Sequence, residues 1–196
     1  MTWYAALFPG QGIVDESMPT LPRFGSLPES HLVPDLLEPG LKLVFCGTAL
    51  GRKSAEARAY YANPTNLFWR TLHEVGLTPE RLRPDAYARL LNHRIGLTDL
   101  AKQHFGNDVD LPADALDRAA LRERIAVHRP AILAFTSKTG AGAFLDRPTG
   151  QIVLGEQAER IGKTRLFVLP SPSGSARRYW DVALWQRLAE AVRALP

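Results

Sequence analysis

The chain has 196 residues, of which 45% are hydrophobic and 22% are charged, and its formal net charge is +4. This length is enough for one domain with a sizeable core, and the composition is typical of a globular protein. No apolar run approaches the roughly 20 residues needed to cross a bilayer. The start MTWYAALFPGQG also lacks the basic and apolar regions of a signal peptide. We therefore expect a cytoplasmic protein that does not enter a membrane.

The chain is poor in cysteine and histidine, residues that form disulfides or bind metals. Cys46 is the only cysteine, which excludes a disulfide within the chain and a cysteine-held iron–sulfur cluster. The five histidines show none of the spacings typical of zinc sites. The sequence thus predicts no metal and no cofactor, while the mild positive charge permits a polyanionic partner without demonstrating one.

The N-terminal part of the chain differs from the rest. Residues 1–40 are rich in proline and glycine and show no sustained hydrophobic period, which indicates an arm or cover. We place this arm at residues 1–32 and a single α/β domain at residues 33–196. The continuous apolar run LKLVFC, residues 41–46, predicts a strand buried on both faces.

The next segments are mainly helical in pattern. PTNLFWRTLHEVG, residues 64–76, predicts a helix that ends at its glycine. Residues 78–94 predict two short helices, the first with Thr78 as N-cap, separated at Pro84. IGLTDLAK, residues 95–102, predicts a short irregular crossing.

Strands and helices then alternate to the end of the chain. The predicted elements are a helix over 112–130 closed by its last proline, a strand over 131–137, a short helix over 138–145, a strand over 164–170 and an amphipathic helix over 179–195. This alternation predicts a three-layer α/β sandwich with a central, mostly parallel sheet flanked by helices. In such sheets the site lies beyond the carboxyl ends of the strands.

Three segments follow the predicted strands: GTALG (47–51), TSKTG (136–140) and SPSGSARR (171–178). Glycines and serines let backbone amides approach an anion closely, and serine and arginine commonly contact phosphodiester backbones. The candidate phosphodiester contacts in these segments or directly after them are Arg52, Lys53, Lys138, Ser173, Gly174, Ser175, Arg177 and Arg178. An ordinary surface turn with solvated arginines remains an alternative for SPSGSARR.

Aromatic residues and one carboxylate complete the set of candidate site residues. Phe68 and Trp69 begin a helix and are expected in the core, whereas Tyr60 and Tyr61 either pack or offer a surface on which a base can stack. Asp99 lies in the apolar segment GLTDL. A buried carboxylate there needs hydrogen bonds or a ligand, although a helix cap is an alternative.

The order FCGxxxG, YANPxNxFW, GLTDL and VLPSPSGSAR resembles the mismatch-specific uracil/thymine-DNA glycosylases of the uracil-DNA glycosylase superfamily. The resemblance runs from about Val33 to the C-terminus. It implies a monofunctional, monomeric, metal-free and cofactor-free DNA repair enzyme. Such an enzyme flips uracil or a related damaged base out of DNA and hydrolyses the N-glycosidic bond, leaving an abasic site.

The resemblance also assigns roles to individual residues. It places the backbone at Gly47 in the base pocket, Tyr61 against the flipped base, Asn66 beside the pocket and Asp99 at the pyrimidine edge. It makes the loop from Ser171 to Ser175 the one that pinches phosphates. Arg177 is implied as the wedge that fills the hole left by the base, with Arg178 as a phosphate contact or alternate wedge.

The first motif departs from the family pattern GINPG, whose asparagine positions the attacking water. GTALG places Ala49 at that position, and a methyl group orients no water. Thr48, Asn66 and Asp99 remain as alternatives for that role, with backbone dipoles stabilising the leaving base. The substitution also motivates a second hypothesis, a catalytically weak protein that binds damaged bases. A nucleotide-binding enzyme is a third, but GTALGRKS matches neither GxxxxGK[ST] nor GxGxxG.

Overall fold

The computed structural model describes residues 32–112 and 114–196. The arm predicted at residues 1–32 therefore lies outside the described residues, except for Leu32. The strands are β1 (Leu43–Leu50), β2 (Ile95–Phe105), β3 (Ile132–Phe135), β4 (Gly155–Ile161) and β5 (Thr164–Val168). The α-helices are α1 (Arg52–Glu56), α2 (Phe68–Glu74), α3 (Arg118–His128), α4 (Lys138–Leu145) and α5 (Val182–Arg193). Short 3₁₀ helices span Pro84–His93, Asp108–Asp110, Thr149–Gln151 and Gly174–Tyr179.

The five strands form one sheet in the order β2-β1-β3-β5-β4. β1 pairs in parallel with β2 and β3, and β3 pairs in parallel with β5, whereas β4 runs antiparallel to β5 at one edge. The carboxyl ends of the four parallel strands therefore share one edge of the sheet, which is where sites form in this class of fold.

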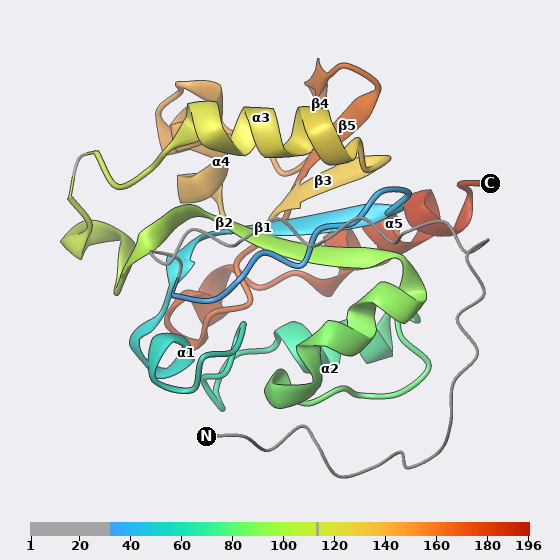
Figure 1. The fold of residues 1–196 in the computed structure, drawn as a ribbon, viewed down its shortest axis with the longest axis horizontal. Coiled ribbons are helices and arrows are strands. Elements are labelled where there is room, and N and C mark those ends of the chain that lie inside the picture. Colours follow the sequence, from blue (N-terminus) through green and yellow to red (C-terminus); the bar gives the residue numbers. More distant parts are fainter. Residues whose placement is uncertain (1–31, 113) are drawn as a thin grey trace, which may run out of the picture.

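Helices cover both faces of the sheet, as Figure 1 shows for α3 and α4 on one side and α2 on the other. Leu43 and Phe45 of β1 pack with α2 and α5, while the alternate residues Val44 and Cys46 pack with α3 and α4. Successive side chains of a strand point to opposite faces, so the apolar first half of β1 contributes to the core on each side of the sheet. The predicted three-layer α/β sandwich is confirmed.

Most predicted elements are present, with shifted ends. β1, β3 and β5 occupy the predicted apolar runs, and α4 occupies the predicted residues 138–145. α3 begins only at Arg118, where Asp117 accepts a hydrogen bond from Ala120 N. α2 likewise begins only at Phe68; its N-cap residue is Leu67, whose side chain makes no capping bond, and Asn66 Oδ1 accepts a hydrogen bond from Phe68 N just before the helix.

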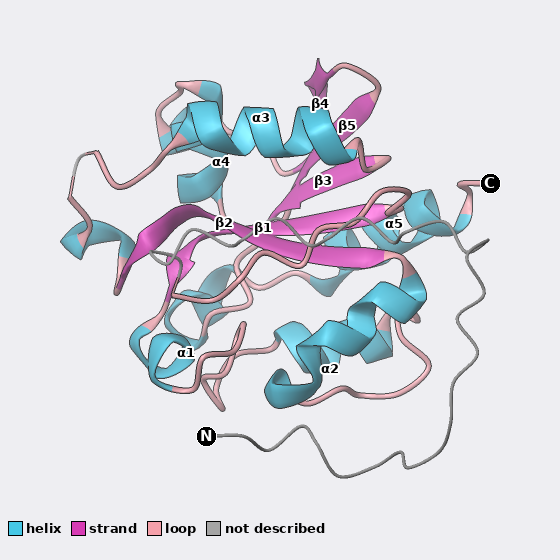
Figure 2. Ribbon diagram, in the orientation of Figure 1, coloured by secondary structure: helices cyan, strands magenta, loops and turns pink. Residues whose placement is uncertain are grey.

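Other local predictions are wrong. Residues 95–102 are not an irregular crossing but part of β2, which Figure 2 shows as a long strand beside β1. Of the two short helices predicted over 78–94, the first is absent, since residues 78–83 are not helical and the Thr78 hydroxyl donates to Glu80 O. The second is present as the 3₁₀ segment Pro84–His93, which is kinked at Ala86. The antiparallel edge strand β4 and the short helix α1 were not predicted.

The segment before β1 runs along the outer edge of the sheet. Leu36 forms an antiparallel bridge with Leu97 of β2, with backbone hydrogen bonds of 2.9 and 3.0 Å. This segment therefore brings Asp35 beside the carboxyl half of β2. Within the ranges that the structure describes, no helix is both long and apolar enough to span a bilayer.

Candidate nucleic-acid interface and active site

A cleft of about 1000 Å³ opens at the carboxyl edge of the sheet. Its lining comes from the ends of β1 and β3, from Asp99 in β2, and from the loops that follow β1, β2 and β5. A cleft of this size suits a ligand as large as a nucleotide. The cleft therefore brings together segments that lie far apart in the sequence.

Most of the predicted site residues line this cleft. They are Gly47, Thr48, Ala49, Arg52, Lys53, Tyr61, Asn66, Asp99, Lys138, Ser171, Ser173 and Ser175. The remaining three predicted residues, Gly174, Arg177 and Arg178, are not among its lining. They belong to the 3₁₀ helix Gly174–Tyr179 at the rim.

Asp99 is the most unusual group in the cleft. Its side chain is only 3% exposed, and its Oδ2 atom has no hydrogen-bond partner among the described residues. Burial raises its pKa to about 7, against the opposing effects of Lys102, Arg124 and a hydrogen bond from Gly47 N–H. Because Asp99 lies inside β2, its interpretation as a helix cap is wrong. A buried carboxylate with an unpartnered oxygen is suited to accept a proton or a hydrogen bond from a ligand.

Gly47 lies directly opposite Asp99 in the register of β1 and β2. A Cβ atom at position 47 would overlap Asp99 Oδ1. Glycine is thus required here for close approach of the carboxylate rather than for an unusual backbone conformation. The pair forms the floor of the cleft.

Tyr61 forms one wall. Its ring stacks on Phe68 with centroids 3.8 Å apart and an interplanar angle of 16°, and its hydroxyl lies 3.2 Å from Thr136 Oγ1. The backbone at Tyr61 has φ = 52°, a conformation uncommon for a bulky residue. A ring backed on one face and fixed at its hydroxyl offers a rigid surface for a flat base.

Ala49 itself has no polar side chain, but a hydrogen-bonded group of polar side chains begins at its neighbour Thr48. Thr48 Oγ1 lies 3.0 Å from Ser137 Oγ and donates to Asp108 Oδ2 at 3.5 Å. Ser137 also caps α4 by accepting from Gly140 N. Asp108, which sequence analysis missed, follows β2 and lines the cleft. Thr48 is therefore tied into a hydrogen-bonded group rather than standing alone.

Two loops are joined at the rim. Leu67 N donates to Pro172 O at 2.9 Å, and Arg177 Nη2 donates to Thr65 O at 3.2 Å. A Cβ atom at Gly174 would overlap Thr65, so glycine permits this contact. The structure thus places Arg177 against the loop that carries Asn66, and its role as a wedge stays a prediction.

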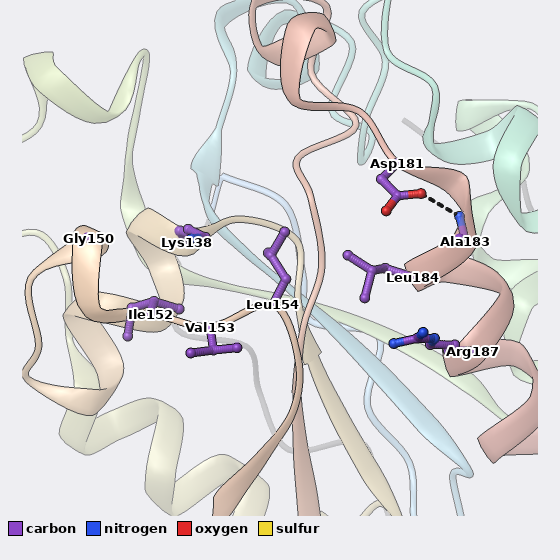
Figure 3. A pocket seen from close by; sticks show the side chains of 9 residues that line it. All are labelled: Lys138, Gly150, Ile152, Val153, Leu154, Asp181, Ala183, Leu184 and Arg187. Atoms are coloured by element: carbon purple, nitrogen blue, oxygen red, sulfur yellow. Dashed lines mark hydrogen bonds between the residues drawn. The ribbon is translucent and has the colours of Figure 1, made fainter.

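The rim carries further aromatic and basic groups. Tyr179 lines the cleft and is 64% exposed, with the Arg178 guanidinium 4.6 Å from its ring centroid. A second hollow of about 470 Å³ lies beside the cleft (Figure 3), and Lys138, Gly150 and Leu154 line both. In this hollow Asp181 caps α5 by accepting from Ala183 N, and Arg187 lies nearby. Basic groups therefore continue past the cleft toward α5.

Sequence analysis also missed a buried charged cluster next to Asp99. It consists of Asp35, Lys102 and Arg124, from the segment before β1, from β2 and from α3. Arg124 is ordinary in its helical pattern, and only the fold brings the three residues together. A lysine and an aspartate in otherwise apolar stretches were the available signals.

The chain matches the family model of the uracil DNA glycosylase superfamily over residues 34–193, and it belongs to this superfamily. Its structure is similar to the solution structure of a protein from Methanosarcina acetivorans that is provisionally assigned as a uracil DNA glycosylase. That match has a TM-score of 0.58 and 22% sequence identity, and it covers 82% of this chain and 96% of the other. At this level of identity the structural likeness shows the fold alone.

Proposed function

We propose that the protein is a monofunctional DNA glycosylase, similar to the mismatch-specific uracil/thymine enzymes, that removes uracil from DNA. The single observation that carries this proposal is the buried Asp99 carboxylate, whose Oδ2 atom has no hydrogen-bond partner among the described residues, in the lining of a nucleotide-sized cleft. Membership of the superfamily supports the reaction class. The substrate is DNA with an extruded base, and the arginines and lysines of the rim are suited to its phosphates.

In the proposed reaction, water attacks the sugar C1′ while the bond from C1′ to the base nitrogen breaks. The base leaves as an anion that takes up a proton, and an abasic site remains. Asp99 acts in its ionised form, accepting a hydrogen bond from the N3–H of uracil or from the attacking water. Tyr61 stacks on the base, and the backbone at the end of β1 stabilises the charge that develops on the base.

Glycosylase assays on oligonucleotides test this proposal. We expect abasic sites, detected by alkaline cleavage, at uracil in a panel that also carries thymine mismatches, xanthine, hypoxanthine and ethenocytosine. Asp99→Ala should lower uracil excision at least about tenfold, roughly 1.4 kcal/mol of transition-state stabilisation. The matched control is Asp85→Ala, which removes an exposed carboxylate paired with Arg83 and should leave excision unchanged.

A second function is favoured by one observation, the methyl group of Ala49 at the position where the family pattern has asparagine. A protein that binds damaged bases without hydrolysis would retard uracil-containing DNA in gels and produce no alkali-labile site. That outcome would replace the glycosylase proposal with a sensor of the same fold.

A further inference from the structure

A cluster of three charged side chains is buried directly behind the cleft. Lys102 Nζ lies 2.8 Å from Asp35 Oδ1, and Arg124 Nε lies 3.2 Å from Asp35 Oδ2. The side chains of Lys102, Asp35 and Arg124 are 6%, 12% and 18% exposed. Lys102 also donates to Val33 O and Tyr60 Oη. Every charged group of the cluster therefore has an oppositely charged neighbour.

The cluster holds β2 at and around Asp99. Thr98 Oγ1 donates to Asp35 Oδ1 at 2.7 Å, and Arg124 Nη2 donates to the backbone carbonyl of Asp99 at 3.0 Å. Lys102 follows three residues later on the same strand. The side chain of residue 98, the backbone of residue 99 and the side chain of residue 102 are thus all bonded to one cluster.

We propose that Lys102 and Arg124, clamped by Asp35, are positioning residues that hold Asp99 in place and set its charge for the reaction. This inference rests on the proposed function, because it concerns the same carboxylate. It adds three residues that neither the family resemblance nor the shape of the cleft identifies.

The charges that face Asp99 come from three elements. Lys102 of β2 and Arg124 of α3 favour its ionised form, and Asp35 of the segment before β1 opposes it. The other titratable neighbours are Cys46 of β1 and the tyrosines of the loop after α1, and burial raises the pKa of each. These groups are neutral near pH 7, so the charges named around Asp99 in the described part of the chain belong to the cluster.

Stability alone is a weak reason for such a cluster. Apolar side chains of similar volume often replace a buried ion pair without loss of stability, because the desolvation of both charges offsets their attraction. An electrostatic effect on the ionisation of Asp99, in contrast, requires the charges of the cluster. The direction in which each variant shifts the pKa of Asp99 therefore separates an electrostatic role of the cluster from a purely structural one.

The test measures uracil excision from pH 5 to 10 under single-turnover conditions. Excision needs ionised Asp99, so its rate should rise with pH through the pKa of Asp99. Lys102→Met should move this midpoint upward by about one pH unit or more, and Asp35→Asn should move it downward. At pH 7 the Lys102→Met variant should be about fivefold slower and should recover at pH 9.

If Lys102→Met does not fold, Arg124→Gln serves as the second variant. The Arg124 side chain lies nearer the surface than that of Lys102, so its replacement should disturb folding less. The midpoint of this variant should also rise, and Arg124→Lys should restore it in part. The control is Arg118→Gln, which removes the same charge from the same helix at an exposed ion pair with Asp146. This control should leave the midpoint unchanged.

A direct measurement keeps the result independent of activity. Carboxyl ¹³C chemical shifts give the pKa of Asp99 in the free protein. Opposite shifts in Lys102→Met and Asp35→Asn support the inference, even if no base is excised and the proposed function fails. If the wild type excises uracil but both variants keep the wild-type midpoint, the cluster is structural and the inference is overturned.

Discussion

Two neighbouring regions of this protein treat a buried carboxylate in opposite ways. In the charged cluster, both oxygens of Asp35 face cationic or hydroxyl donors. On the floor of the cleft, Asp99 is at least as inaccessible, yet its Oδ2 atom is left without a partner among the described residues. The comparison teaches that counter-charges surround one of the two buried carboxylates and leave an oxygen of the other without a partner in the described part of the chain, although Arg124 Nε in the cluster also makes no hydrogen bond there.

The strongest test of this comparison removes the satisfied carboxylate. Asp35→Ala leaves Lys102 and Arg124 buried without a counter-charge, which typically lowers stability by about 3–5 kcal/mol. Urea denaturation should show this decrease in the free energy of unfolding. Asp85→Ala, at an exposed pair, should change it by less than about 1 kcal/mol. A small effect of Asp35→Ala would mean that the two carboxylates do not differ in this way.

The second test uses the pH dependence of stability at the open carboxylate. The folded-state pKa of Asp99 is raised to about 7, so folding favours its protonated form. The stability from this preference is fully present below about pH 4 and is lost as the pH rises through about 7. The Asp99→Asn variant has no such titration at this position.

Wild type should therefore lose up to a few kcal/mol of stability relative to Asp99→Asn between pH 4 and pH 8. Urea denaturation of both proteins across this range measures the difference. A difference that stays constant with pH would show that folding does not favour the protonated form of Asp99, and the contrast between the two carboxylates would then lose its electrostatic basis.

Tyr61 combines satisfied groups and a surface available to a ligand in a single side chain. Its hydroxyl is bonded to Thr136 and one ring face is covered by Phe68, while the residue lines the cleft. Tyr61→Ala should weaken binding of uracil-containing DNA by about 1–3 kcal/mol, measured by fluorescence anisotropy. Tyr61→Phe should keep base binding and lose about 1 kcal/mol of folding stability with its hydrogen bond. Equal loss of binding in both variants would assign the interaction to the hydroxyl.

The smallest expected effect concerns a satisfied group at the rim. Arg177 donates to Thr65 O, and as a wedge it would act chiefly on paired DNA. Arg177→Ala should reduce excision from a U·A duplex more than from single-stranded uracil DNA. Equal reduction on both substrates, with a salt dependence lower by about one unit, would make Arg177 a phosphate contact.

The fold was largely predictable because its central strands and its last helix have clear hydrophobic patterns in the sequence. β1 and β3 are continuous apolar runs, and α5 carries an apolar stripe, so hydrophobic pattern alone locates them. β2 escaped prediction since Thr98, Asp99 and Lys102 interrupt its apolar pattern. Those polar residues are buried because Asp35 and Arg124 come to them from distant segments. β4 was missed because its sequence GEQAERI is mostly polar and contains no apolar run.

In the cleft, too, some residues were predictable from local sequence and others depend on contacts between distant segments. Residues at strand ends, such as Gly47 and Lys138, were predictable because parallel strands finish at one edge. Asp99 was predictable from a carboxylate in an apolar segment. Asp108 and the charged cluster depend on contacts between segments far apart in sequence, and no local pattern encodes those contacts.

The one thiol of the chain has a practical consequence. Cys46 is the only cysteine, it is 1% exposed in the core between the sheet and helices α3 and α4, and burial raises its pKa. A thiol reagent such as a chromogenic disulfide therefore reaches it only when the centre of the sheet opens. The rate of colour development under native conditions would report how often that opening occurs. Repeating the measurement with bound DNA would show how strongly a ligand at the edge of the sheet restrains its middle.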